Sequence, residues 1–330
     1  MTGVRTSTMA VLLSASLAAA LMSCGDDSSQ TPAAPAATSG ASGGTDGDFS
    51  GLVDVGGRNL YLECRGSGTP TVILQSGFAN AGDIWSIAET HPPAVQPGIA
   101  ETNRVCSYDR PGSMIVTTTG TDGTVTVAAE PLPGRSDPVP MPRDPADVVT
   151  ELHDLLAAAE VPGPYVLVGH SLGGPLNVLY ARTYPDQVIA LVTVDSPMPV
   201  ARMLLAPQQW EMIIDEQRHP ASYLQGPPDY ELEAYDFDVL FDEIEAAPPL
   251  PAVPFTVIVR GGNDPIPEDV PASKAEAVEA YNRIWPQAEA DFAASVPGAE
   301  LITVPDTTHY VHVQRPDAVI EAIHEVIAGA

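Results

Sequence analysis

Basic residues are scarce in this chain of 330 residues. It has 14 lysine and arginine residues against 43 aspartate and glutamate residues, so its formal net charge is -29 at pH 7. A chain of this sign repels the phosphate backbone of nucleic acids and acidic membrane surfaces. The composition therefore argues against a nucleic-acid partner and is typical of a soluble surface in a salty or extracellular setting.

The N-terminal region also lacks an apolar run of membrane-spanning length. Residues 9–22 are apolar and rich in alanine, but fourteen residues at about 1.5 Å each do not cross a bilayer core of about 30 Å. Arg5 gives the stretch a weakly basic start. Leu21-Met-Ser-Cys24 follows and resembles a bacterial lipobox, although Met22 stands where a small residue is usual. We expect residues 1–23 to be a lipoprotein-type signal peptide and Cys24 to carry a lipid that anchors the protein to the cell membrane, facing outside. Plain secretion is the alternative.

Aromatic residues are absent from residues 25–48, where proline, alanine, threonine, serine and glycine dominate. Such a composition buries too little apolar surface to form a core, so residues 24–50 are expected to be a flexible tether. The remaining residues, 51–330, suffice for one large α/β domain.

The stretch around Ser171 has the form of a nucleophile elbow. The apolar run at residues 165–168 predicts a buried strand, and the period changes to that of a helix directly after Gly169-His-Ser-Leu-Gly-Gly174. A sharp turn from strand to helix strains the residue between them, and Gly169 and Gly173 leave room for it. The pattern Gly-x-Ser-x-Gly can also arise by chance in a chain with 27 glycines. The strand before it and the helix after it favour a nucleophilic Ser171.

Strand-like and helix-like segments alternate along the domain and predict a mostly parallel sheet. Strands are expected at residues 52–55, 60–64, 71–74, 104–108, 165–168, 188–194, 254–259 and 300–304. Helices are expected to begin near residues 85, 145 and 274 and directly after the elbow, and a last helix is expected to include residues 319–327. Two segments interrupt the alternation. Residues 113–143 are expected to form a small hairpin around Asp122-Gly123 and then a proline-rich excursion, and residues 197–251, rich in acidic residues, proline and aromatic residues, are a candidate lid.

A serine nucleophile needs a base, and the base needs a carboxylate that fixes its tautomer. In an open α/β sheet both belong at the carboxyl ends of strands. His309 directly follows the last expected strand and is the expected base, with His312 as the alternative. The pair also has the His-x-x-His spacing of some metal sites, but no third ligand has suitable spacing, so no metal is expected.

Asp264 is the expected acid. It lies in the turn Gly261-Gly-Asn-Asp-Pro265 after a buried strand and stands between Ser171 and His309 in the chain. Asp195, at the end of the strand after the elbow, is the alternative acid. Asp306 is too near His309 in sequence to be more than a turn former.

Acyl transfer also needs two hydrogen-bond donors that bind the developing oxyanion. The Leu172 amide, directly after the nucleophile, is one candidate. The Phe78 amide is the other, because Gln75-Ser-Gly-Phe78 leaves the carboxyl end of the third strand on the same side of the sheet as the elbow. Simple turn chemistry at Ser76 and Gly77 is the alternative explanation.

Four motifs together resemble the α/β-hydrolase superfamily over about residues 52–327. They are Gly169-His-Ser-Leu-Gly-Gly174, Tyr108-Asp-Arg-Pro-Gly112, Gly261-Gly-Asn-Asp264 and His309-Tyr-Val-His-Val-Gln-Arg-Pro316. The resemblance is to single-domain serine hydrolases with a lid after the sixth strand. It implies an α/β-hydrolase fold, with a mostly parallel eight-stranded sheet whose second strand is antiparallel, helices on both faces, and a Ser171, Asp264, His309 triad. Ser76, where a histidine often stands, and the long 113–143 excursion depart from the pattern and weaken analogies of substrate.

The same resemblance gives two cysteines a meaning. It places the second strand beside the fourth, which implies that Cys64 and Cys106 are neighbours. We expect them to form a disulfide in an exported protein, with two buried thiols as the alternative.

These features predict an exported, carboxylesterase-like serine hydrolase that acts on a small-molecule ester or amide and needs no cofactor. One alternative is an aminopeptidase of the proline-iminopeptidase type, in which Glu231, Glu233 or Asp236 of the lid would hold the substrate amine. Cofactor-free perhydrolysis uses the same triad and is a further alternative. A surface binding module that kept the fold and lost turnover is the alternative from another class.

Overall fold

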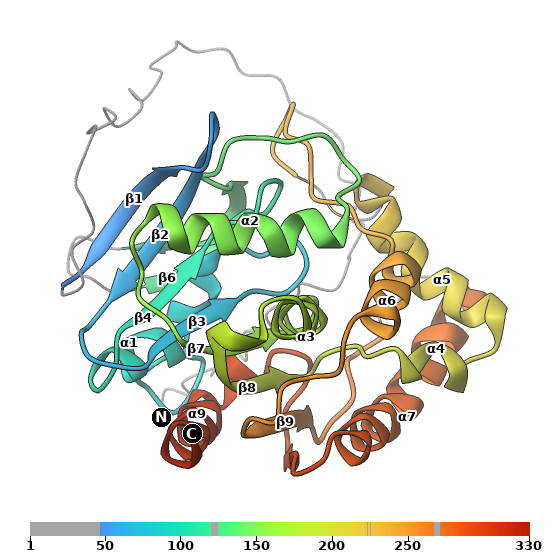
Figure 1. The fold of residues 1–330 in the computed structure, drawn as a ribbon. Helices are drawn as coiled ribbons and strands as arrows, with labels where there is room; N and C mark the ends of the chain where they lie inside the picture. The colour runs from blue at the N-terminus through green and yellow to red at the C-terminus, as the bar shows by residue number, and fades with distance from the viewer. Residues whose placement is uncertain (1–46, 120–124, 223, 225, 267–270) are drawn as a thin grey trace, which may run out of the picture.

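The computed structural model describes residues 47–119, 125–222, 224, 226–266 and 271–330 (Figure 1). The expected signal peptide, Cys24, most of the expected tether and the Asp122-Gly123 turn lie outside these residues. None of the helices in the described ranges combines the length and the apolar character needed to cross a membrane.

Eight strands form one sheet in the described part of the chain, in the order β1-β2-β4-β3-β7-β8-β9-β10. β2 is antiparallel to β1 and to β4, and the other neighbouring strands are parallel. This is the predicted α/β-hydrolase sheet, with its second strand reversed. The strands are β1 (Phe49–Asp54), β2 (Asn59–Arg65), β3 (Thr71–Gln75), β4 (Val105–Tyr108), β7 (Tyr165–His170), β8 (Val188–Val194), β9 (Phe255–Arg260) and β10 (Glu300–Val304).

Each face of the sheet has its own apolar core, because alternate residues of a strand point to opposite faces. Leu167 and Leu191 pack on one face with α2 and α3, whereas Val166 and Val192 pack on the other with α1 and α9. Figure 1 shows α2 and α3 on one side of the sheet and α9 on the other. The helices are α1 (Val95–Ala100), α2 (Pro145–Ala158), α3 (Gly173–Thr183), α7 (Ala272–Ser295), α8 (Val311–Gln314) and α9 (Pro316–Gly329), with a 3-10 turn η2 (Pro185–Gln187).

Both interruptions of the alternation are visible as separate structures. The expected hairpin is a two-stranded antiparallel sheet of β5 (Met114–Thr119) and β6 (Val125–Pro133). Residues 197–251 follow β8, the sixth strand of the main sheet, and contain α4 (Val200–Leu204), α5 (Pro207–Arg218), η3 (Pro220–Ser222) and α6 (Phe237–Ala246). Figure 1 shows this segment beside the end of the sheet that carries α7.

One expected helix is wrong. The segment that contains Trp85 is a short 3-10 turn, η1 (Gly82–Ser86), and the α-helix of this connection begins only at Val95. Pro92 and Pro93 precede it, and because proline has no amide hydrogen it cannot continue a helix from Trp85. Trp85 instead buries its ring in the core on the α1 and α9 face.

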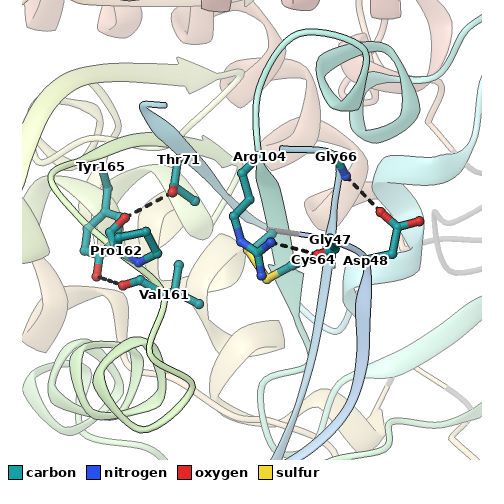
Figure 2. Close-up of a disulfide and its surroundings, with 10 residues drawn as sticks. Gly47, Asp48, Cys64, Gly66, Thr71, Arg104, Val161, Pro162 and Tyr165 are labelled. Atoms are coloured by element: carbon teal, nitrogen blue, oxygen red, sulfur yellow. Dashed lines mark hydrogen bonds between the residues drawn. A yellow bond between two sulfur atoms is a disulfide. The ribbon is translucent and has the colours of Figure 1, made fainter. Parts of the chain in front are cut away.

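The disulfide between Cys64 and Cys106 is present, as the resemblance implied. The two residues are direct partners in the antiparallel β2–β4 pair, and both are buried. Figure 2 shows the surrounding contacts, in which the Arg104 guanidinium donates to the Gly47 carbonyl at 2.8 Å and the Gly66 amide donates to Asp48 Oδ1 at 3.0 Å. These bonds attach the start of the described domain to the β2–β4 pair that the disulfide crosslinks.

Candidate active site

Ser171 occupies the sharp turn between β7 and α3. Its backbone φ is 50°, a left-handed conformation that costs a residue with a Cβ on the order of 1–3 kcal/mol. A Cβ on Gly169 would lie 2.4 Å from the carbonyl carbon of Gly173, and one on Gly173 would lie 2.3 Å from the carbonyl oxygen of Gln75. Both glycines are therefore required by close backbone approach, and the strained turn is the elbow geometry that the sequence predicted.

His309 lies in the loop after β10, and its ring contacts Asp195 rather than Asp264. The His309 Nδ1 is 2.6 Å from Asp195 Oδ2. Asp195 directly follows β8 and its side chain is fully buried, while the His309 side chain is 25 % exposed. An ionised carboxylate can only accept, so Nδ1–H donates and Nε2 is left as the basic nitrogen.

The Asp195 carboxylate is held by several donors besides the imidazole. Oδ2 also receives a hydrogen bond from Arg260 Nη1 at 2.8 Å, and Oδ1 receives one from Trp285 Nε1 at 2.8 Å and one from the Arg260 amide at 3.1 Å. Burial by itself raises the pKa of Asp195, but the Arg260 guanidinium and the His309 hydrogen bond outweigh burial and lower this pKa below its ordinary value. Asp195 is therefore ionised near neutral pH.

The expectation that Asp264 holds the imidazole is wrong in this structure. Asp264 Oδ1 accepts a hydrogen bond from the backbone amide of His309 at 2.9 Å, and Oδ2 forms an ion pair with Arg260 Nη1 at 2.9 Å. The loop after β10 lies directly on the loop after β9, where the Gly262 amide donates to the Thr307 carbonyl at 2.8 Å. This contact brings Asp264 to the main chain of His309, while the imidazole extends to the end of β8.

His170 connects the elbow to the His309 loop. Its Nε2 donates to the His309 carbonyl at 2.8 Å, and the two rings have centroids 4.6 Å apart. No hydrogen bond joins the Ser171 hydroxyl to the His309 ring among the described residues. The serine turn and the expected base therefore lie at the same edge of the sheet with no hydrogen bond between them. Catalytic hydrogen bonds commonly become short only when substrate is bound.

His312, the alternative base, is buried against Trp85 and His170, with ring centroids 4.6 and 4.1 Å away. Burial, followed by the neighbouring His309, lowers the pKa of His312 to about 3. It therefore packs as a neutral ring behind the site. Within the described ranges, no group of three or more histidine, cysteine, aspartate or glutamate side chains could hold a metal ion.

The expected oxyanion turn, Gln75-Ser-Gly-Phe78, lies against the elbow. A Cβ on Gly77 would lie 2.8 Å from His170 Nδ1 and 3.1 Å from Ser171 Cβ. Neither the Phe78 amide nor the Leu172 amide donates a hydrogen bond to another described group. Gly77 is thus glycine because the elbow side chains fill the space a Cβ would need, and two unpaired amides flank this contact.

A family model described as the alpha/beta hydrolase family matches residues 72–322, which is most of the chain. The chain belongs to the α/β-hydrolase family. The match includes the elbow, both carboxylates and His309, so the site described above lies inside the region that defines the family.

The matches between this hydrolase and its curated relatives cover only part of each chain. The "Putative carbamate hydrolase RutD" of Yersinia enterocolitica is 30 % identical over 141 residues, which are 42 % of this chain and 41 % of the relative. The chain spans less than half the length of the curated relatives it matches.

Solved structures resemble the hydrolase over more of its length. A thermophilic esterase from Thermogutta terrifontis has a TM-score of 0.52 at 19 % identity and covers 85 % of this chain and 98 % of its own. The carboxylesterase CesB (YbfK) from Bacillus subtilis has a TM-score of 0.52 at 15 % identity and covers 86 % of this chain and 92 % of its own. At such identities the likeness shows the fold.

Sequence reasoning about this hydrolase missed the groups that hold the two candidate carboxylates and the expected oxyanion turn. Arg260, Trp285 and Asn282 surround the two carboxylates, and Asn282 Oδ1 accepts from Arg260 Nη2 at 2.9 Å. Arg110 belongs to a motif that carried the family resemblance, but the residues around it in the sequence did not indicate a role for it. A signal for Arg260 was present, because a charged residue at the end of an otherwise apolar strand is buried only when it is paired.

Proposed function

We propose that this hydrolase is an exported serine enzyme that cleaves small carboxylic esters through an acyl-enzyme. The observation that carries the proposal is the hydrogen bond from His309 Nδ1 to the buried Asp195, at the sheet edge where the strained Ser171 turn lies. A nucleophile, a base and an orienting carboxylate at one edge are the groups that acyl transfer by serine requires.

In the proposed reaction, His309 Nε2 takes the proton from the Ser171 hydroxyl while the oxygen attacks the ester carbonyl. Asp195 stabilises the imidazolium that forms, and the imidazolium then protonates the departing alcohol. Water then attacks the acyl-enzyme while His309 Nε2 takes its proton, and the imidazolium returns this proton to the Ser171 oxygen as the acid leaves. The amides of Phe78 and Leu172 hold the oxyanion, each contributing roughly 3 kcal/mol to the transition state.

An apolar cluster beside the oxyanion turn supports an apolar acyl group of medium size. Ala79, Met114 and Leu232 form this cluster, with Phe78 and Tyr230 packed against it. Tyr230 and Leu232 also line a cavity of about 420 Å³, but Ser171, His309 and Phe78 are not part of its lining. The support for an apolar acyl group therefore comes from the apolar cluster alone.

The amide alternative has less support from the lid carboxylates. Glu233 is buried against Arg110, with Oε1 2.9 Å from Nη2, and Asp236 accepts from Arg218 Nε at 3.0 Å. Their charges are therefore already balanced, and only the exposed Glu231 among the three remains open to a substrate amine. We expect p-nitrophenyl esters to be hydrolysed faster than proline anilides. An aryl carbamate should be tested as a third substrate class, because the relative RutD is named as a putative carbamate hydrolase.

Labelling with a fluorophosphonate probe tests the chemistry. The wild-type protein should react covalently at one site, and Ser171→Ala should abolish labelling while its thermal midpoint stays close to the wild-type value. A folded wild-type protein that is not labelled would support the non-catalytic binding module instead.

Export and lipidation form the second half of the proposal and rest on the N-terminal sequence alone. Expression of the full chain in a bacterium, followed by detergent phase partitioning, should place the wild-type protein in the detergent phase and Cys24→Ala in the aqueous phase. A wild-type protein found free in the medium would favour plain secretion.

A further inference from the structure

A buried ion pair lies behind the oxyanion turn and outside the triad. Arg110 follows β4, and Glu233 lies in the 197–251 segment, 123 residues away. Arg110 Nε donates to Glu233 Oε2 at 2.9 Å and Nη2 donates to Oε1 at 2.9 Å. The side chains are 1 % and 0 % exposed. Replacing such a pair with apolar residues is often neutral for stability, so stability alone does not explain its presence.

The same guanidinium holds two carbonyls of the oxyanion turn. Arg110 Nη1 donates to the Ser76 carbonyl at 2.8 Å, and Nη2 donates to the Gly77 carbonyl at 2.6 Å. The Gly77 carbonyl and the Phe78 amide belong to one planar trans peptide unit, in which C=O and N–H point in opposite directions. A guanidinium that fixes this carbonyl therefore also fixes the direction of the Phe78 N–H.

Glu233 holds the next peptide unit in the same way. Its Oε1 accepts a hydrogen bond from the Ala79 amide at 2.5 Å, and Tyr235 donates its hydroxyl to Oε2 at 3.1 Å. Both peptide units that flank Phe78 are thus fixed by the ion pair. A cation on the Gly77 carbonyl also polarises the peptide, which makes the Phe78 N–H a stronger donor.

We propose that Arg110 and Glu233 are positioning residues for the oxyanion hole: Arg110 directs and polarises the Gly77–Phe78 peptide, and Glu233 ties this turn to the 197–251 segment. The proposal rests on the serine-hydrolase function above. It makes the 197–251 segment a structural part of the catalytic machinery, because Glu233 comes from that segment.

The kinetics of Arg110→Gln and Arg110→Lys test the proposal, with active sites counted by the fluorophosphonate probe. Arg110→Gln should lower kcat for a p-nitrophenyl ester by about 10- to 100-fold and leave KM within about threefold, because the ester carbonyl gains most from the donor only in the transition state. The affinity for an alkyl boronic acid, whose serine adduct is tetrahedral and anionic, should weaken by a similar factor. Arg110→Lys keeps a cation and should recover part of both losses.

Glu151→Gln is the matched control. Glu151 is a buried carboxylate that pairs with Arg143 Nη2 at 3.0 Å and contacts no group of the oxyanion turn. This variant should lower the thermal midpoint, while kcat for each active site stays within twofold of wild type. Tyr235→Phe removes one hydrogen bond to Glu233 and should lower kcat by about two- to fivefold. If Arg110→Gln does not fold, kcat and the boronic acid affinity of Tyr235→Phe test the same proposal.

An Arg110→Gln or Tyr235→Phe protein that loses only thermal stability, with kcat and boronic acid affinity unchanged, would assign the ion pair a purely structural role and overturn this inference alone. A wild-type protein that neither labels nor hydrolyses esters would overturn the proposed function and this inference with it.

Discussion

Asp264 accepts a hydrogen bond from the backbone amide of His309, whereas the imidazole of His309 is hydrogen-bonded to Asp195. The two carboxylates at this edge of the sheet therefore have different relations to one histidine. Asp195 contacts the ring and Asp264 contacts the main chain, while Arg260 bridges both through Nη1, at 2.8 and 2.9 Å. In the proposed reaction, Asp195 therefore has the orienting role and Asp264 a supporting one.

Exchange of each carboxylate for its amide separates these roles. Asp195→Asn should lower kcat by roughly 10³- to 10⁴-fold, because a neutral amide neither fixes the tautomer nor stabilises the imidazolium. Asp264→Asn should lower kcat by less than about tenfold, since its amide oxygen can still accept from the His309 amide. Steady-state kinetics normalised to labelled sites measure both effects. A loss in Asp264→Asn as large as that in Asp195→Asn would restore Asp264 as the acid.

Gly77→Ala should damage the site more than the fold. The added Cβ would lie 2.8 Å from His170 Nδ1 and 3.1 Å from Ser171 Cβ, so the elbow and the oxyanion turn must move apart. We expect the rate of fluorophosphonate labelling to fall by about 100-fold or more, in line with the loss of one oxyanion donor. Gly51→Ala is the control, because its Cβ would meet only the Phe49 ring at 3.5 Å. Equal labelling rates in the two variants would contradict the close approach.

The Cys64–Cys106 disulfide should make a large contribution to stability. It closes a loop with a sequence separation of 42 residues, for which the chain-entropy model gives about 4 kcal/mol. Urea unfolding of Cys64→Ala/Cys106→Ala should therefore show a free energy of unfolding lower by about this amount. Alkylation of the unreduced, denatured wild-type protein should find neither thiol. A double variant with the wild-type unfolding midpoint would show that the crosslink does not constrain the unfolded chain.

The buried histidines are neutral in the folded protein, so each should make a destabilising contribution that grows as the pH falls below about 6.5. Burial lowers the pKa of His312 from 6.5 to about 3, and it lowers the pKa of His170 well below its ordinary value. Between these limits the unfolded chain binds the extra proton, so the free energy of unfolding decreases by about 1.4 kcal/mol per pH unit for each such group as pH falls. His312→Phe should remove one of these contributions, as urea unfolding between pH 7 and pH 5 would measure. His170, His309 and Asp195 face the same cluster in both proteins, so parallel profiles would contradict the assignment.

The local sequence pattern predicted most of the fold. The limits of β8 and β10 coincide with the apolar runs at residues 188–194 and 300–304, and α2 begins at Pro145 after Asp144, whose carboxylate caps it by accepting from the Ala146 amide at 2.9 Å. These features succeed because periodicity, proline and capping act between residues that are neighbours in the chain. The helix expected at Trp85 failed, since two prolines further along decide where that helix can start.

The sequence by itself determined the strands, the elbow with its glycines, and the histidine after the last strand. Each of these depends on the backbone and side chains of a few consecutive residues. The tertiary structure alone decided which carboxylate meets the His309 ring and which residue anchors the oxyanion turn. Asp195 and His309 are 114 residues apart, and Arg110 and Glu233 are 123 apart. Such pairs depend on how neighbouring strands and loops pack against each other. The residues next to a side chain in the sequence do not indicate which distant side chain it will contact.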